Sequence, residues 1–351
     1  MAKLKAVSER QLPRQGVRRA AKTMDDIARL AKVSKPTVSR ALQDSPLVNA
    51  ATKERIIAIA VKHGYSVNRN AQRLRTRRSS IIAVVLHLPQ QSGRAVAAPF
   101  IFQLLADVSR ALSIRNQDLL LCSAESDEAH AYERMLASKG VDGFIFLGQG
   151  TNGAWLSELA KTNAPFVVWG AVDDTQPYCA VGSDNLAGGV LAGRRFAQLG
   201  RTRALFIGNR AHAEMDLRRR GLEAGLKEGR SIAAVIDLEI ADFSYETAYQ
   251  AMKEKLAGKR AQFDAVFAGS DIVAMAALVA LREAGLRTPE DVSVIGYNDI
   301  PFAAHVSPPL TTIRQDTHQA GALLVEKLFQ ILDGARPKSV TLPTELIVRQ
   351  T

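Results

Sequence analysis

The sequence predicts an α + α/β protein, in which a small three-helix module precedes two doubly wound α/β subdomains. Residues 23–67 have helical spacing with capping signals. From Ile81 onward, apolar strands alternate with amphipathic helices, which is the pattern of a parallel sheet. The chain has 351 residues, too many for one ordinary core, so several compact units are expected.

Positive charge is concentrated at one end of the chain. The net charge is +11, but residues 1–80 contain 19 Lys and Arg against 5 Asp and Glu, a balance of +14. The remaining 271 residues contain 27 Lys and Arg against 30 Asp and Glu, a balance of −3. This asymmetry is typical of a nucleic-acid-binding segment joined to a near-neutral globular body.

Residues 1–22 are predicted to be a basic disordered extension because they lack hydrophobic periodicity. They either attract phosphates nonspecifically or reflect a start codon placed too far upstream. No secretory signal or membrane-length apolar run is present, so we expect a cytoplasmic protein with no membrane partner. Cys122 and Cys179 lie in apolar contexts and are expected to be buried strand thiols, in keeping with a reducing compartment.

Thr23 begins the first predicted helix. It is a good N-cap, and Asp26 completes a capping pattern that places acidic charge at the positive end of the helix. The inward face is expected to contain Ile27, Ala28 and Ala31. Lys32 and Val33 then form a short connection to the next helix.

The second predicted helix starts near Lys35, with Ser34 as its cap and Pro36 in its first turn. Its inward residues are Val38, Ala41 and Leu42. The exposed side and the amino-terminal end, which helix-turn-helix proteins present to DNA bases, therefore contain Lys35, Pro36, Thr37, Ser39 and Arg40. Lys35, Thr37 and Arg40 are expected to read or position DNA, whereas Pro36 offers only apolar contact.

A third helix completes the core of this module, with Asn49 as its cap and Gly64 after its end. At this point the residues carry a specific resemblance. The segments VSKPTVSRAL (33–42), TKERII (52–57) and HGYSVNRNAQRL (63–74) resemble the headpiece and hinge of the lactose-repressor (LacI/GalR) family of bacterial regulators. The headpiece is thus predicted to span residues 23–67 and the hinge residues 68–79.

The hinge is poor in apolar residues and rich in like charges, so alone it should be mostly unfolded in water. The resemblance implies that it becomes helical only on DNA, where paired hinges enter the minor groove and a leucine wedges between base pairs. Leu74 is the matching residue, and the alternative is that it is a core residue of the hinge. The resemblance places Ala71 and Gln72 beside Leu74. The predicted DNA-binding residues also include Thr23 and Ser34 of the headpiece and Asn68 of the hinge.

Residues 80–351 are predicted to form the α/β core of two subdomains. A first run of strands and helices extends from Ile81 to Gly170, and a second run begins at the strand CAVGS (179–183). The segment from Thr311 and a final strand near Val340 to Val348 would return across the joint, as the resemblance implies for a periplasmic-binding-protein-like architecture. Because ligands bind outside the carboxyl ends of strands, a cleft between two such sheets is the expected effector site.

Polar and aromatic residues just after the strands are the candidates for lining this cleft. The resemblance implies that Arg218 holds a ligand hydroxyl or carboxylate, that Phe243 stacks on the ligand, and that Asn298 stands where many members have aspartate. The aromatic residues could instead be core, Arg218 could lie on a solvated helix face, and the histidines could satisfy local hydrogen bonds. The full set of candidates is His87, Phe100, Trp169, His212, Glu214, Arg218, Phe243, Ser270 and Asn298.

Enzymatic function is not expected, because no nucleophile elbow, metal-ligand spacing, Walker loop or dinucleotide fingerprint occurs. We therefore predict no catalytic residues, no metal and no cofactor. A transport-type ligand-binding protein would need a signal peptide and would have no use for residues 23–78. The favoured function is a repressor of a carbohydrate-utilisation operon, released from a palindromic double-stranded operator when a sugar or sugar acid binds. The alternative is a corepressor-driven regulator.

A homodimer is expected. The sequence ends without a leucine heptad, so it lacks the helix that forms tetramers in the lactose repressor.

Overall fold

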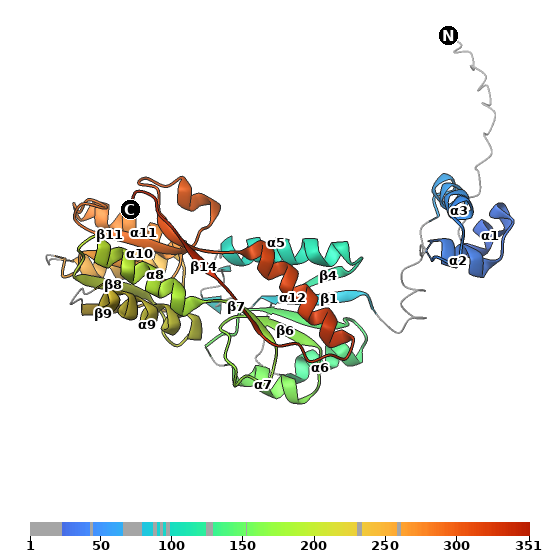
Figure 1. The fold of residues 1–351 in the computed structure, drawn as a ribbon, viewed down its shortest axis with the longest axis horizontal. Coiled ribbons are helices and arrows are strands. Elements are labelled where there is room, and N and C mark those ends of the chain that lie inside the picture. Colours follow the sequence, from blue (N-terminus) through green and yellow to red (C-terminus); the bar gives the residue numbers. More distant parts are fainter. Residues whose placement is uncertain are drawn as a thin grey trace, which may run out of the picture. The chain divides into compact units, whose positions relative to one another are not determined.

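A computed structural model describes residues 23–42, 45–65, 79–86, 90–91, 94–95, 99–123, 129–151, 153–229, 234–257 and 261–351. The chain divides into two compact units, Met1–Arg77 and Arg78–Thr351 (Figure 1). The first unit is helical and the second is α/β, so the predicted α + α/β class is confirmed.

The first unit contains the helices α1 Met24–Ala31, α2 Lys35–Leu42 and α3 Ala50–Lys62. The predicted caps form. The Thr23 hydroxyl accepts a hydrogen bond from the Asp26 N–H at 3.2 Å, and Asn49 Oδ1 accepts one from the Thr52 N–H at 2.8 Å. The three helices enclose a small apolar core made of Ile27, Ala28, Ala31, Val38, Ala41, Val48, Ile56 and Ala60.

The second unit contains two six-stranded sheets. The first sheet has the order β13-β7-β6-β5-β1-β4, with β1 Ile81–Leu86, β4 Asp118–Ser123, β5 Gly143–Leu147, β6 Phe166–Trp169, β7 Ala180–Ser183 and β13 Val340–Leu342. The second sheet has the order β14-β12-β11-β10-β8-β9, with β8 Arg203–Gly208, β9 Ala234–Glu239, β10 Ala265–Ala268, β11 Ser293–Asn298, β12 Thr311–Gln315 and β14 Thr344–Ile347. Within these two sheets all strand pairs are parallel except β12 with β14, which agrees with the strand-helix alternation of the sequence.

Helices cover both sheets. The first sheet and its helices form the first subdomain, with α5 Pro99–Ile114, α6 Ala129–Ala137, α7 Ala154–Lys161 and α12 Thr317–Leu332. The second sheet and its helices form the second subdomain, with α8 Asn185–Gln198, α9 Ala213–Glu228, α10 Tyr245–Leu256, α11 Asp271–Glu283 and the short helix η1 Pro301–Ala304. Helix α12 lies beside α5 although more than 200 residues separate them, and the Thr317 hydroxyl donates to Asp107 at 2.8 Å (Figure 1).

The strand assignment differs from the sequence prediction in two places. Strand β7 was expected to open the second subdomain, but it pairs with β6 and belongs to the first sheet. The single strand predicted near Val340 to Val348 is two strands, β13 in the first sheet and β14 in the second. Pro343 separates them, because proline lacks the N–H that a continuous strand would use. The chain therefore crosses between the subdomains three times, after β7, after β12 and after β13.

Helices α8 and α9 approach each other unusually closely through glycines. A Cβ atom added at Gly189 would lie 2.2 Å from the Arg218 carbonyl oxygen, and one at Gly221 would lie 2.1 Å from the Leu186 carbonyl oxygen. Only glycine permits this backbone contact. The close approach brings the amino-terminal end of α8 within hydrogen-bond reach of α9.

Two smaller expectations need correction. Cys179 is buried as predicted, but it precedes β7, and Cys122 is only half-buried because β4 is an edge strand of the first sheet. The sequence also gave no sign of the short hairpin of β2 Gln90–Gln91 and β3 Arg94–Ala95. No helix in the described part of the chain is long and apolar enough to cross a membrane.

Candidate functional site

Helix α2 presents polar residues at its amino-terminal end. Ser34 Oγ accepts a hydrogen bond from the Thr37 N–H at 3.3 Å and caps the helix as predicted. Lys35, Pro36 and Arg40 are exposed, and Thr37 is half-buried. A short helix with exposed polar and basic residues at this end can enter a DNA major groove.

Ser39 does not lie on the exposed side of α2, where the sequence placed it. Only 8% of Ser39 is exposed. Lys35, one turn earlier, donates through Nζ to the Asp25 carboxylate of α1 at 2.7 Å. Residues four apart share a helix face, so this edge of α2 faces α1 and encloses Ser39. Thr23 lies at the start of α1, where its hydroxyl also donates to Asp26 at 2.8 Å.

Some of the predicted site residues lie outside the described residues. These are His87 of the predicted cleft and, in the predicted hinge, Asn68, Ala71, Gln72 and Leu74. Their roles therefore stay predictions.

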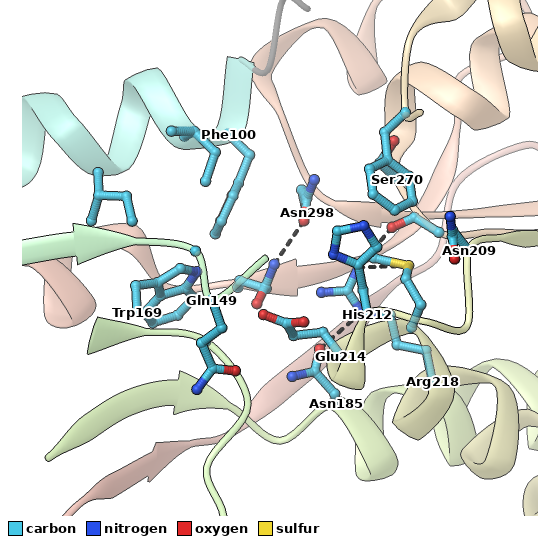
Figure 2. A pocket seen from close by; sticks show the side chains of 18 of the residues that line it. Phe100, Gln149, Trp169, Asn185, Asn209, His212, Glu214, Arg218, Ser270 and Asn298 are labelled. Carbon is cyan, nitrogen blue, oxygen red and sulfur yellow. Dashed lines mark hydrogen bonds between the residues drawn. The ribbon is translucent and has the colours of Figure 1, made fainter. Parts of the chain in front are cut away.

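The second unit contains a cavity of about 340 Å³ at the carboxyl ends of both sheets (Figure 2). It is lined by residues at or just after the ends of β5 to β12, and by residues of α5 and α9. The volume lies near the lower end of the range of about 300–1,000 Å³ for small-molecule sites. Eight of the nine predicted cleft residues line this cavity, namely Phe100, Trp169, His212, Glu214, Arg218, Phe243, Ser270 and Asn298.

Arg218 lines the cavity and contacts three other elements of the second subdomain. Its Nε donates to Asn185 Oδ1 at 2.8 Å, and its Nη1 donates to the Gly269 carbonyl oxygen at 2.7 Å. The guanidinium carbon lies 3.6 Å from the ring centroid of Tyr297. Burial lowers the pKa of Arg218, and only 5% of the residue is exposed, so the alternative of a solvated helix face is wrong.

Asn185 extends this connection to the first crossing between subdomains. Its Oδ1 accepts from Arg218, while its Nδ2 donates to the Ser183 carbonyl oxygen at 3.0 Å. Ser183 ends β7 and Asn185 begins α8. Arg218 is thus linked through the Asn185 side chain to the end of β7, where the chain crosses from the first subdomain to the second.

Asn298 is held at the cavity by a second amide. Gln315 Nε2 donates to Asn298 Oδ1 at 2.7 Å. This bond occupies the Asn298 oxygen, so its Nδ2 remains as a donor and the Gln315 oxygen as an acceptor. Asn298 also has a φ of 115°, a conformation that non-glycine residues rarely adopt and that is frequent at functional sites.

Asp271 supports the strand ends that carry Asn298. The residue is fully buried, and its carboxylate accepts hydrogen bonds from the Ile300 N–H at 2.8 Å and from the Thr312 hydroxyl. Burial raises the pKa of Asp271 to about 7, while the hydrogen bonds from Thr312 and Ile300 act in the opposite direction. Asp271 therefore holds the loop after β11 against β12 rather than lining the cavity.

Aromatic rings form part of the cavity wall in each subdomain. Phe100 and Trp169 of the first subdomain have ring centroids 5.9 Å apart, and His212 and Phe243 of the second have centroids 5.3 Å apart. Phe100 and Trp169 also belong to the buried core, so each takes part in both the cavity wall and the core. Such faces can pack against the apolar faces of a ring-shaped ligand.

The sequence prediction missed several amides that line the cavity, namely Gln149, Asn185, Asn209 and Gln315. Gln149, Asn209 and Gln315 lie at or just after strand ends, so the rule that found Trp169 could have found them. Gln149 is a positioning residue, because its amide donates to the Ala171 carbonyl oxygen at 2.9 Å and accepts from the Ala171 N–H at 3.0 Å.

Comparison with known proteins places this arrangement in a family. The description "Bacterial regulatory proteins, lacI family" matches residues 23–68, and "Periplasmic binding protein-like domain" matches residues 194–351. The HTH-type transcriptional regulator CelR of Thermobifida fusca is 33% identical over 344 residues, which cover 95% of this chain and 99% of CelR. The chain belongs to the LacI family. It is a helix-turn-helix transcriptional regulator, as the sequence resemblance predicted.

Other LacI-family proteins are similar over most of their length. The repressor PurR of Aliivibrio salmonicida is 30% identical over 312 residues, covering 88% of this chain and 91% of PurR. The ribose operon repressor of Escherichia coli K12 is 31% identical over 315 residues, covering 88% and 92%. These relatives are transcriptional regulators rather than enzymes.

Two solved structures of the LacI family resemble this chain. The transcriptional regulator CelR–cellobiose complex has a TM-score of 0.66 and 31% identity, covering 93% of this chain and 99% of that chain. The Lac repressor dimer bound to operator and the anti-inducer ONPF has a TM-score of 0.76 and 27% identity, covering 94% and 98%. The headpiece and the two-sheet unit are therefore both LacI-like.

Proposed function

We propose that this LacI-family regulator represses a carbohydrate-utilisation operon and leaves its operator when a sugar-type effector occupies the cavity. The observation that carries the proposal is the presence, in one chain, of a helix-turn-helix and a cavity lined by aromatic rings and amides. The solved structures of the Lac repressor on its operator and of CelR with cellobiose support the two halves of the proposal.

On the DNA side, Lys35, Thr37 and Arg40 of α2 contact the major groove, and Pro36 packs against a thymine methyl group. The Lys35 ammonium exchanges its bond to Asp25 for a DNA contact. The predicted hinge, residues 68–79, enters the minor groove with Leu74 as the wedge. The basic balance of residues 1–80 makes the affinity fall steeply with salt.

The regulator acts as a homodimer, so that two headpieces meet the two halves of a palindromic operator. Apolar side chains of α5 and of the edge strand β4 support a second copy as the partner. The exposed fractions are 46% for Phe102, 78% for Ile114, 41% for Leu120 and 49% for Leu121. Exposed apolar residues on neighbouring elements are typical of a protein interface. The similarity to the Lac repressor dimer supports this assembly.

On the effector side, amides and hydroxyls suit a ligand with many hydroxyl groups, because both kinds of group donate and accept. Asn298 offers a donor and Gln315 an acceptor at one wall of the cavity. The rings of Trp169 and Phe243 pack against the apolar faces of a sugar. Arg218 transmits occupancy to Asn185 and thus to the connection after β7.

The alternative within the family is a corepressor, which would tighten DNA binding. The 30% identity to the repressor PurR keeps this alternative in the test, because the family that the sequence resembles includes purine-responsive members whose ligand tightens DNA binding. The two cases differ in the sign of one measured change, because the ligand weakens the DNA complex in the first and strengthens it in the second.

The test uses the purified full chain. Preferred sites are selected from random duplex DNA, and the affinity for the best palindrome is then measured by fluorescence anisotropy with and without cellobiose, ribose or hypoxanthine. We expect a preference for a palindrome over random DNA, and a sugar that weakens binding by about 5- to 150-fold. Tightening by hypoxanthine would establish the corepressor alternative. Absence of any preferred palindrome at low salt would refute the regulator mechanism proposed here.

A further inference from the structure

Glu214 differs from the other acidic residues of its helix. Helix α9 contains four acidic residues, Glu214, Asp216, Glu223 and Glu228. Asp216 pairs with Arg210 at 2.7 Å, Glu223 with Lys227 at 2.8 Å, and Glu228 with Arg194 at 2.6 Å. Among the described residues, no Lys, Arg or His lies within ion-pair distance of Glu214, although three arginines follow it on α9.

The neighbouring arginines are engaged elsewhere. Arg218 bonds to Asn185 and to the Gly269 carbonyl oxygen, and Arg219 bonds to Asp237 at 2.7 Å. Glu214 instead lines the cavity and is only half-buried. Figure 2 shows its carboxylate pointing into the space between Trp169 of the first subdomain and Arg218 of the second. A carboxylate placed this way is available to a ligand.

The described residues that line the cavity include one negatively charged and one positively charged side chain. Of the lining residues that the structure describes, Glu214 is the only carboxylate and Arg218 the only lysine or arginine. The remaining polar side chains are amides, hydroxyls and a histidine. A neutral ligand leaves this balance intact, and its hydroxyls can donate to Glu214. A carboxylate on the ligand would add a second negative charge to a partly desolvated space.

From these contacts we infer that Glu214 is a specificity-determining residue, which accepts hydrogen bonds from a neutral polyhydroxyl effector and excludes sugar acids. The inference rests on the proposed function, since it takes the cavity as the effector site, and it removes the sugar acids that the sequence left open. Two like charges about 6 Å apart at an effective dielectric constant of about 20 weaken binding by about a hundredfold. Attraction to Arg218 offsets part of this, so we expect a discrimination of about tenfold or more.

The experiment compares pairs of ligands that are similar in size but differ in charge, on the full chain. Dissociation constants are measured by isothermal titration calorimetry for cellobiose against cellobionate, and for glucose against glucuronate. The proteins are the parent chain, Glu214→Gln and the control Asp216→Asn. Asp216 is on the same helical turn and outside the cavity lining, so its variant reports the effect of losing one negative charge nearby.

We expect the parent chain and Asp216→Asn to prefer the neutral member of a pair by about tenfold or more, and Glu214→Gln to lose most of that preference. An unchanged preference in Glu214→Gln, an equal change in both variants, or a parent chain that prefers the acid would each overturn the role of Glu214. These outcomes leave the carbohydrate site intact. If neither pair binds to any of the three proteins, the carbohydrate assignment of the cavity fails, and the inference fails with it.

Discussion

Replacing Arg218 by alanine tests the connection between the cavity and the crossing after β7. The truncation removes two donors, so Asn185 Oδ1 and the Gly269 carbonyl oxygen, bonded at 2.8 and 2.7 Å, lose their partner. Each buried acceptor left without a donor costs about 1–3 kcal/mol. Loss of the stacking on Tyr297, 3.6 Å from the guanidinium carbon, adds about 2 kcal/mol.

An opposing effect reduces this sum. In the parent chain the Arg218 guanidinium is buried, and burial lowers its pKa. The free-energy cost of removing this charged group from water is absent in the variant. We therefore expect the free energy of unfolding of Arg218→Ala to fall by about 3–5 kcal/mol, which is less than the sum of the separate losses because the desolvation cost is removed with the guanidinium. The operator affinity should persist below the melting temperature, because Arg218 belongs to the second unit.

The assay combines urea denaturation, followed by circular dichroism, with operator binding in the presence and absence of the effector sugar. Arg220→Ala is the matched control, because Arg220 is exposed on the same helix and lies 3.9 Å from Asp216. Its effect should stay below about 1 kcal/mol. The reasoning is refuted if Arg218→Ala is as stable as Arg220→Ala and its operator complex still responds to the sugar.

Three further predictions concern the headpiece, the pH dependence and the glycine contact. Arg40→Ala should reduce the preference for the selected palindrome over random DNA by about 1–3 kcal/mol in competition binding. The control Arg55→Ala also removes an exposed positive charge, but it should weaken binding to palindromic and random DNA alike. Equal effects of the two variants would show that Arg40 does not read the sequence. Burial raises the pKa of Asp271 to about 7 in the folded chain, against about 3.9 in the unfolded chain. The contribution of this proton to the free energy of unfolding is therefore complete below pH 4 and is lost as the pH rises to 7. In thermal denaturation, the free energy of unfolding of Asp271→Asn should therefore rise relative to that of the parent chain by up to about 1.4 kcal/mol per pH unit in this window. A difference between the two proteins that does not change with pH would contradict the raised pKa. Gly189→Ala should lower the free energy of unfolding in urea by about 1–3 kcal/mol or more, because its Cβ would lie 2.2 Å from a carbonyl oxygen. The control Gly140→Ala, whose Cβ would lie 3.4 Å from its nearest atom, should change the free energy of unfolding by less than about 0.5 kcal/mol.

Much of the site could be predicted from the order of strands and the residues that follow them. The carboxyl ends of parallel strands meet at one edge of a sheet, so Trp169, Ser270 and Asn298 were expected in one cleft, and they line one cavity. Their partners could not be predicted this way. Gln315 bonds to Asn298 because β12 lies beside β11 in the sheet. The Gly269 carbonyl oxygen accepts a hydrogen bond from Arg218 because the folded chain brings the residue after β10 to the side chain of α9.

The sequence by itself determined the features that depend on short-range physics. Helix caps such as Thr23 and Asn49, the exposed end of α2 and the alternation of strands with helices involve residues within a few positions of each other. The tertiary structure alone decided that β7 belongs to the first sheet, that the strand after Lys338 divides at Pro343, and that Ser39 is enclosed. It also decided which acidic residues are paired. These outcomes depend on pairing and packing between segments far apart in the chain, and local periodicity carries no information about such contacts.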